Sequence, residues 1–317
     1  MNDVRVDERQ RTPATAPTAA PSAARAKGPR VWLDMDQQEL DDAYDQLKYA
    51  ANAQQLAERR AVEGAQVRAR LGEPERIAYG PSAIETIDLY RAGRADAPIA
   101  LLIHGGAWRA RRATEFCTPA ELFVRAGAHC VIPDFAGVDQ LDGDIGVVAD
   151  QVIRAAGFVY DNAARLGGSP QRIYLFGHSS GGHLAGVLAT ADWRFTGRPA
   201  RLFEGVLLSS GMYDLAPVRL SKRSNYVKFT DANVERLSAQ RHIEFLNAPL
   251  VLAYGTYETP EFQRQAREFH AAVAAAGKPV ELIVGEGYNH FEMCETLANP
   301  YGLIGRAALA QMQLAPA

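Results

Sequence analysis

Six short apolar runs alternate with longer mixed segments over most of the chain. The runs are bounded by Gly, Pro or Asp and cover residues 98–103, 129–133, 172–176, 205–209, 249–254 and 280–284. The segments between them are long enough for helices, at residues 119–126, 145–166, 183–191 and 260–276. Apolar strands that alternate with helices are typical of a parallel sheet covered on both faces. The pattern therefore predicts an α/β fold.

Two further strand-like runs precede these six. They cover residues 76–79 and 84–90 and are separated by Gly80 and Pro81, which favour a turn. The two runs predict an opening hairpin. A hairpin followed by six strands gives a mostly parallel sheet of about eight strands, flanked by helices.

The N-terminal part of the chain has two different patterns. Residues 1–30 are dominated by Ala, Pro, Thr and Arg and have no apolar run, which predicts a disordered tail. Residues 33–71 have apolar positions at helical spacing and must pack on another part of the protein. We therefore expect a tail at 1–30 and a single domain at 31–317, with an N-terminal helical segment at 31–72 and a small cap insertion at about 211–247.

Composition places the chain among ordinary soluble globular proteins, because hydrophobic residues make up 47% and charged residues 22%. A formal net charge of −3 leaves no basic field to hold a nucleic acid. No run approaches the roughly 18 apolar residues of a membrane span. We expect neither nucleic acid nor membrane as a partner.

The cysteines indicate a reducing compartment. Cys117, Cys130 and Cys294 are odd in number and show neither a CxxC pair nor the spacing of a zinc site. We therefore expect a cytoplasmic protein without a structural metal. The sequence leaves the oligomeric state open, and a homodimer is one alternative.

The sharpest local signal is Gly177-His178-Ser179-Ser180-Gly181, directly after the run at 172–176 and before a helical segment. It fits the G-x-S-x-G nucleophile elbow, in which glycines let a strand turn sharply into a helix and expose the serine hydroxyl. As a bare five-residue pattern it also fits an ordinary loop. In this context it predicts Ser179 as a nucleophile.

A second signal, His104-Gly105-Gly106-Ala107-Trp108, follows the run at 98–103. The elbow geometry requires backbone amides from this loop, together with the amide after the nucleophile, to bind a developing oxyanion. The expected donors are Gly105, Gly106, Ala107 and Ser180. We interpret His104 as structural.

A nucleophilic serine needs a base, and the base needs a carboxylate to hold its tautomer. Glu258 follows the run at 249–254, and His290 follows the last run, so the chain order is serine, acid, histidine. Glu261 and Asp214 are the alternatives to Glu258 as the acid. Cys294, four residues after His290, is interpreted as a buried thiol because no second base is placed to activate it.

Four segments together resemble the arylformamidase (kynurenine formamidase) branch of the α/β-hydrolases. They are HGGAW, GHSSGGHLA, SGMYDLAPV at residues 210–218 and GTYETPEFQRQ at residues 255–265. The likeness extends from about Asp34 to Phe291. It implies an α/β-hydrolase fold with Ser179 as nucleophile, Glu258 as acid and His290 as base.

The sequence departs from this family at Ala107, where the loop usually carries an aromatic residue before or beside the tryptophan. The departure enlarges the space near the acyl group, so an acyl group larger than formyl is compatible with the loop. Carboxylesterases of the hormone-sensitive-lipase type share the HGG loop and the elbow. The family is therefore better defined than the substrate.

Several residues are candidates for substrate contact. Trp108 and Phe291 flank the predicted site and would contact an aromatic ring. Arg109, Arg111 and Arg112 follow the HGG loop and are either partners for a substrate carboxylate or a solvated face. Residues 213–214 and 224–226 lie where the cap is expected, and either line the pocket or pack the cap.

The leading functional hypothesis is a cofactor-independent serine hydrolase that cleaves an amide or ester of a small aromatic compound through an acyl-enzyme. One alternative is a general short-chain carboxylesterase. An alternative of another class is a non-catalytic binding protein that uses the same fold and pocket for a ligand.

Overall fold

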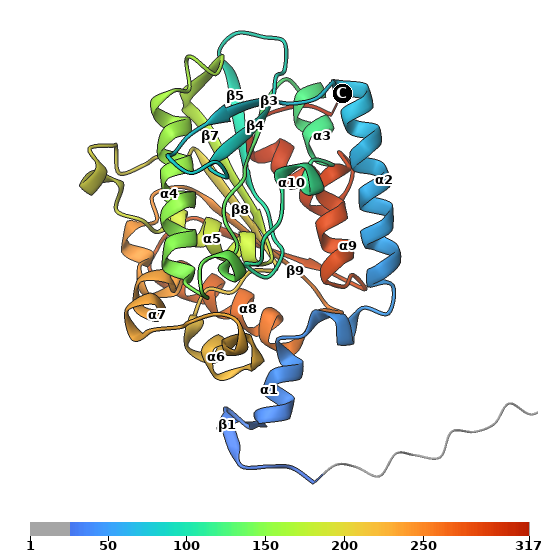
Figure 1. Ribbon diagram of the computed structural model, residues 1–317, viewed down its shortest axis with the longest axis vertical. Coiled ribbons are helices and arrows are strands. Elements are labelled where there is room, and N and C mark those ends of the chain that lie inside the picture. Colours follow the sequence, from blue (N-terminus) through green and yellow to red (C-terminus); the bar gives the residue numbers. More distant parts are fainter. Residues whose placement is uncertain (1–25, 317) are drawn as a thin grey trace, which may run out of the picture.

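The structure, a computed structural model that describes residues 26–316, is built around one eight-stranded sheet (Figure 1). In spatial order its strands are β10 (Val280–Gly285), β9 (Leu250–Gly255), β8 (Gly205–Ser209), β7 (Gly168–His178), β5 (Ala97–Ile103), β6 (His129–Pro133), β4 (Thr86–Tyr90) and β3 (Glu75–Ala78). In this sheet β4 is antiparallel to its neighbours β3 and β6, and the other pairs are parallel. The predicted sheet and its opening hairpin are confirmed.

Alternate residues of the strands enter two hydrophobic cores, one on each face of the sheet. In β5, Ile99, Leu101 and Ile103 join the core with α4 (Ile145–Asp161), α5 (Ser180–Ala189) and α8 (Pro260–Ala275). Ala100 and Leu102 join the core with α2 (Ala53–Leu71), α3 (Ala120–Arg125) and α10 (Leu303–Gln311). Figure 1 shows α4 and α2 on opposite sides of the sheet. A strand with apolar side chains on both faces of the sheet must be covered by helices on both faces.

The N-terminal segment contains several elements where the sequence predicted one helical stretch at 33–71. They are β1 (Arg30–Trp32), β2 (Met35–Asp36), α1 (Gln37–Ala43), a 3-10 turn (Gln46–Tyr49) and α2. Asp36 caps α1 by accepting a hydrogen bond from the amide of Glu39, and Asp45 caps the 3-10 turn through the amide of Leu47. These caps lie inside the run of apolar spacing, so periodicity alone did not reveal the breaks.

Other boundaries also differ from the sequence prediction. Residues 1–25 of the predicted tail lie outside the described part of the chain, and Arg30 already belongs to β1. Helix α4 ends at Asp161 instead of continuing to residue 166. Helix α5 begins at Ser180, directly after the predicted nucleophile, so that the turn and the helix are continuous.

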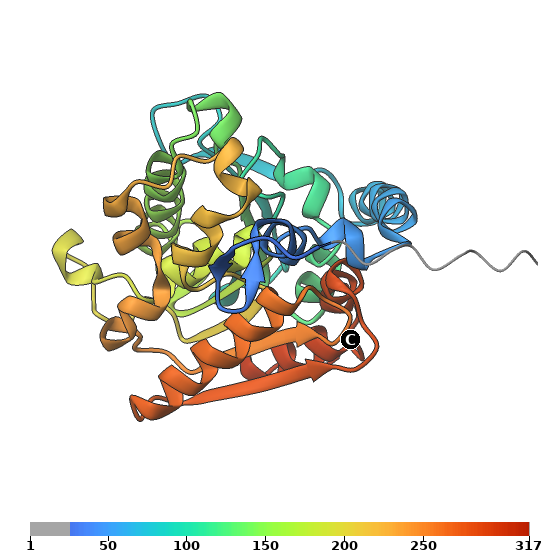
Figure 2. The ribbon, with the colours of Figure 1, turned by 90° about the horizontal axis from the view of Figure 1, so that it is seen from below.

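The region predicted as a cap lies between β8 and β9 and contains α6 (Leu215–Leu220) and α7 (Asp231–Leu237). The N-terminal segment docks on it. The side chain of Gln37 donates to the carbonyl of Leu220 at 2.8 Å, and the amide of Lys222 donates to Asp41 at 2.6 Å. The two segments therefore cover the same end of the molecule, where Figures 1 and 2 show α1 close to α6 and α8.

The loops that carry the candidate site leave the sheet at one edge. They follow the carboxyl ends of β5, β7, β9 and β10, which are parallel neighbours or near neighbours. Open α/β sheets bind their ligands outside the carboxyl ends of the strands. The topology thus brings four distant segments of sequence to one place.

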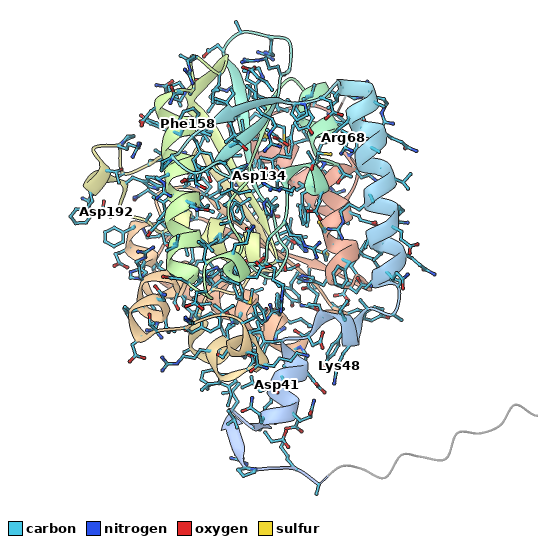
Figure 3. All side chains as sticks on the ribbon, in the orientation of Figure 1. Asp41, Lys48, Arg68, Asp134, Phe158 and Asp192 are labelled. Atoms are coloured by element: carbon cyan, nitrogen blue, oxygen red, sulfur yellow. The ribbon has the colours of Figure 1, made fainter. Side chains whose placement is uncertain are left out.

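Asp88 of β4 is a buried carboxylate in an unfavourable setting. It is 1% exposed, and Arg76 lies 3.3 Å from its Oδ1 without a hydrogen bond to either oxygen. Burial is the main cause that raises the pKa of Asp88, from the ordinary 3.8 to about 6. The neighbouring Asp134 (Figure 3) is satisfied instead, by Arg76 at 2.6 Å and by the amide of Ala113 at 2.6 Å.

Because the pKa of Asp88 is raised by folding, ionised Asp88 opposes folding. The destabilisation by ionised Asp88 is nearly absent below about pH 4, where the carboxyl is protonated in both states, and is complete above about pH 6. We expect the change in the free energy of unfolding caused by Asp88→Asn to be more favourable at pH 8 than at pH 4, by about 2 kcal/mol. Urea unfolding at the two pH values measures the difference. The matched control Asp134→Asn should destabilise the protein at pH 8, and a pH-independent effect of Asp88→Asn would contradict the argument.

Candidate active site

Ser179 lies at the tip of the turn between β7 and α5, in a backbone conformation that non-glycine residues rarely adopt. Its φ is 59° and its ψ is −128°. The turn is so tight that a Cβ on Gly177 would lie 2.4 Å from the carbonyl oxygen of Gly181, and one on Gly181 would lie 2.1 Å from that of Ile103. The amide of Ser179 donates to the carbonyl of Ser209 at 3.0 Å. The two glycines of the motif are thus required by close backbone packing.

The structure brings Ser179, His290 and Glu258 together. His290 is the first residue of α9 (His290–Glu295), and its Nε2 lies 2.9 Å from the Oγ of Ser179. Its Nδ1 lies 2.8 Å from the Oε2 of Glu258. The imidazole and the carboxylate are almost completely buried. In this arrangement the imidazole can accept the serine proton while the carboxylate stabilises the resulting positive charge.

Three further donors hold the carboxylate of Glu258. Its Oε1 accepts hydrogen bonds from the amide of Gly255 and from the hydroxyl of Ser210, both at 2.7 Å. Its Oε2 accepts one from the side chain of Gln46 at 3.4 Å. Sequence reasoning missed Ser210 and Gln46. Ser210 directly follows a buried strand, which is a signal for a site residue, whereas Gln46 carries no such signal.

The two alternative acids have other partners. Glu261 accepts a hydrogen bond from the hydroxyl of Tyr44 at 2.9 Å and forms an ion pair with Arg264 at 2.7 Å. Asp214 accepts from the amide of Ala216 and so caps α6. Of the three candidate acids, Glu258 is therefore the one whose carboxylate lies within hydrogen-bond distance of the imidazole of His290.

The HGG loop lies against the serine turn. A Cβ on Gly105 would be 2.9 Å from the carbonyl oxygen of His178 and 3.2 Å from the Cβ of Ser179. Within residues 26–316, the amides of Gly105, Gly106, Ala107 and Ser180 donate to no protein acceptor. Four free amides on two adjoining segments are the type of donor that an oxyanion needs.

The side chain of Trp108 holds the HGG loop to α5. It is 1% exposed, and its indole N–H donates to the Nδ1 of His183 at 3.1 Å. Burial lowers the pKa of His183 to about 4, so its ring is neutral and can accept this hydrogen bond. The sequence placed Trp108 beside the substrate, and the structure places most of its surface in the core.

The other two predicted contact residues lie closer to the surface. Phe291 is half-buried, and its ring meets the imidazole of His290 edge-on, with centroids 5.3 Å apart. Arg109 is exposed and lies over the ring of Tyr226 at 4.1 Å. Arg111 and Arg112 have carboxylate partners at 3.3 Å and 3.6 Å, which favours the solvated-face interpretation for these two arginines.

His178 is a second imidazole beside His290, with ring centroids 4.6 Å apart. Burial, followed by the charge of His290, holds the pKa of His178 well below its ordinary value. A neutral ring here adds no positive charge that would oppose protonation of His290. Cys294 was predicted to be a buried thiol, and the structure shows this residue half-buried. Desolvation still raises the pKa of its thiol, which disfavours the reactive thiolate.

The described part of the chain contains neither a cluster of metal-binding side chains nor a membrane-spanning helix. Residues 26–316 contain no group of three His, Cys, Asp or Glu side chains that could hold a metal ion. All three cysteines are free, and no described helix is long and apolar enough to cross a membrane.

Several known proteins are similar to this chain in sequence. Residues 87–207 match the BD-FAE family. Kynurenine formamidase from Danio rerio is 27% identical over 240 residues, which cover 74% of this chain and 80% of the relative. The kynurenine formamidase from Salmo salar is also 27% identical, over 70% of this chain and 76% of its own length.

Solved structures share the fold. A protein from Silicibacter sp., described as a thioesterase candidate, superposes with a TM-score of 0.74 at 22% identity, over 87% of this chain and 99% of its own. A thermophilic esterase from Thermogutta terrifontis gives a TM-score of 0.63 at 20% identity, over 78% and 97%. The predicted α/β-hydrolase fold is thereby confirmed.

We expect Glu258→Gln to lower kcat by about 10⁴, because an amide can contact the imidazole but cannot stabilise its protonated form. Glu261→Gln is the matched control, since Glu261 is equally buried and bonds Tyr44 and Arg264. Its kcat should stay within about tenfold of wild type, with a lower stability. Steady-state kinetics on an aryl ester measure both, and a larger loss in the Glu261 variant would assign the acid role to that residue.

Proposed function

We propose that this chain, a kynurenine formamidase-like α/β-hydrolase, is a serine hydrolase that cleaves an amide or ester bond of a small aromatic substrate through an acyl-enzyme. The observation that carries the proposal is the position of His290, which bridges Ser179 and Glu258 at 2.9 Å and 2.8 Å. These distances lie within the range of direct hydrogen bonds.

In the proposed reaction, the Oγ of Ser179 attacks the substrate carbonyl while the Nε2 of His290 takes its proton. The protonated imidazole then gives that proton to the leaving amine or alkoxide, and the acyl group stays on the serine. Water, deprotonated by the same imidazole, attacks the acyl-enzyme and releases the acid. Glu258 keeps the Nδ1 proton in place and stabilises the imidazolium in both half-reactions.

The free amides of the HGG loop and of Ser180 would bind the oxyanion of each tetrahedral intermediate. Their fixed positions support this role, because donors that are already oriented need no reorganisation when charge develops. Losing one such donor typically costs about 3 kcal/mol of transition-state stabilisation. Buried Trp108 contributes by holding the loop to α5 through His183.

An aromatic substrate is supported by similarity to the kynurenine formamidases and by the rings around the imidazole. Phe291 and Phe262 both meet the ring of His290 edge-on, at 5.3 Å and 5.2 Å. A general short-chain carboxylesterase is the second candidate, and structural similarity to the thermophilic esterase favours its consideration. The small side chain of Ala107 is compatible with either a formyl or a larger acyl group.

We expect Ser179→Ala to fold normally and to lose turnover, because the turn depends on its glycines and the reaction depends on the hydroxyl. The residual rate should fall to about 10³–10⁴ above the uncatalysed reaction. A fluorophosphonate probe should label the wild type and not the variant. Absence of label on the wild type would favour a non-catalytic binding protein, and wild-type turnover by the variant would exclude Ser179 as nucleophile.

Amide and ester preferences separate the two enzyme hypotheses. We expect kcat/KM for formanilide to exceed that for acetanilide by at least about tenfold, because the formyl carbonyl is less hindered and more electrophilic than the acetyl carbonyl, even where Ala107 leaves room for both acyl groups. Phenyl formate and phenyl acetate serve as ester controls with the same acyl groups. Hydrolysis of the esters alone would favour the carboxylesterase.

A further inference from the structure

The N-terminal segment contacts both loops that carry Glu258 and His290. Its residue Gln46 lies in the 3-10 turn before α2 and is 6% exposed. The Nε2 of Gln46 donates to the Oε2 of Glu258 at 3.4 Å, and its Oε1 accepts from the amide of Thr259 at 3.3 Å. That same Oε2 lies 2.8 Å from the Nδ1 of His290. Gln46 therefore holds the carboxylate oxygen that faces the imidazole.

Six residues farther along the chain, Asn52 makes a similar pair of hydrogen bonds to the other loop. Its Nδ2 donates to the Oε1 of Glu292 at 2.7 Å, and its Oδ1 accepts from the Nδ2 of Asn289 at 2.8 Å. Asn289 and Glu292 form the capping box of α9, in which each side chain accepts a hydrogen bond from the other's backbone amide. Because His290 is the first residue of α9, Asn52 supports the turn that carries the imidazole.

The side chain of Asn52 does not cap its own helix. Asn52 stands at the N-cap of α2, where an asparagine normally accepts a hydrogen bond from the first turn of the helix that follows. In the described part of the chain its side chain makes no such bond. Both of its polar atoms are used by the capping box of α9 instead. Figure 1 shows α2 and α9 side by side.

The two loops also contact each other directly, through their backbones. The amide of Tyr257 donates to the carbonyl of Tyr288 at 3.0 Å, which aligns the loops after β9 and β10. The hydrogen bonds of Gln46 and Asn52 are made beyond this point, at the carboxylate itself and at the first turn of α9. One short segment of the chain is thus bonded to both sides of the hydrogen bond between carboxylate and imidazole.

We propose that Gln46 and Asn52 are positioning residues, which hold the carboxylate of Glu258 and the imidazole of His290 in line for proton transfer from Ser179. The inference rests on the proposed hydrolase function and adds the N-terminal segment to the parts of the chain on which that function depends. Both residues act through others. Their loss should therefore lower kcat and leave KM nearly unchanged, because a displaced imidazole affects the chemical step more than substrate binding.

The first test is Asn52→Ser, assayed on the best wild-type substrate among the anilides and phenyl esters. Serine is as favourable as asparagine at an N-cap, so it can cap α2, but its side chain is too short to reach Glu292. We expect the free energy of unfolding in urea to be maintained, while kcat per folded molecule falls about tenfold at similar KM.

Arg59→Met is the matched control for Asn52→Ser. Arg59 also joins α2 to α9, through an ion pair with Glu295 at the other end of that short helix. Its side chain is 53% exposed, so its loss should keep kcat within about twofold of wild type. A kcat of Asn52→Ser that is equally close to wild type overturns the assignment of Asn52, whatever the effect on stability.

The second test is Gln46→Met, which keeps the length of the side chain and removes both of its hydrogen bonds. We expect kcat to fall by about three- to tenfold. The acidic limb of the pH profile of kcat/KM should also move to higher pH, because a carboxylate that loses a donor favours the protonated imidazole. Gln37→Met is the matched control, since Gln37 is exposed in the same segment and donates to the carbonyl of Leu220. A merely structural role would lower the profile without moving it, and an unmoved limb overturns the assignment of Gln46.

The acidic limb reports on Gln46 because the other groups that face the imidazole are unchanged. These groups are Glu258 and the neutral ring of His178, on which the charge of Arg60 from α2 also acts. Gln46→Glu brings a second carboxylate to Glu258, so its acidic limb should move farther in the same direction. This variant keeps the acceptor for the amide of Thr259, so it provides the comparison if Gln46→Met does not fold.

Failure of the hydrolase function gives a different result from failure of these assignments. If the wild type hydrolyses none of the amides or esters, the proposed function fails, and proton NMR then tests the positioning without turnover. The Nδ1 proton of His290, bonded to Glu258, should give the most downfield resonance, which His290→Gln should remove. We expect it to broaden or shift upfield in Gln46→Met and Asn52→Ser, but not in the two controls. An unchanged resonance in either variant overturns the assignment of that residue, and its absence from the wild type overturns the proposal.

Discussion

The buried carboxylate of Glu258 is the constraint on which the rest of the site depends. A carboxylate without water needs hydrogen-bond donors, because an unsatisfied buried charge is strongly destabilising. Its donors come from four parts of the chain: Gly255 at the end of β9, Ser210 after β8, Gln46 of the N-terminal segment and His290 after β10. The sheet edge and the N-terminal segment must therefore assemble together for the imidazole to be held in place.

Backbone strain is concentrated in the same region. Ser179, Ser210, Ala107 and Trp108 all have positive φ, between 53° and 59°. Such conformations persist only where surrounding contacts determine them. The amide of Ser210 donates to the carbonyl of Ala253 at 2.8 Å, and the carbonyl of Trp108 accepts from the amide of Val138 at 2.8 Å. Strand β9 and the 3-10 turn Val138–Gln140 thus hold these loops in shapes that they would not adopt alone.

Much of this architecture could be predicted from the sequence because its signals are local. Each strand is an apolar run between Gly, Pro or Asp. The serine turn is indicated by Gly177 and Gly181, positions where the Cβ of any other residue would collide with the backbone. Glu258 and His290 follow the ends of late strands, and the parallel topology brings such positions together.

The features that escaped prediction depend on contacts between distant segments. Gln46 reaches Glu258 across 212 positions of sequence, and Arg223 reaches the carbonyl of Tyr44 across 179. Nothing in their local sequence distinguishes them from surface residues. The buried position of Trp108 depends likewise on His183, which is 75 residues away. Local patterns define strands and turns, whereas the partners of a buried polar group follow from tertiary packing.

The groups around the imidazole indicate how it can take a proton. The rings of His178 and His183 have pKa values that are lowered mainly by burial, so both rings are neutral. His178, whose ring centroid lies 4.6 Å from that of His290, therefore adds no positive charge that would oppose protonation of His290. The carboxylate of Glu258 lies 2.8 Å from the Nδ1 of His290 and would stabilise the new charge. The same hydrogen bond that satisfies a buried carboxylate would thus also prepare the imidazole to accept the serine proton.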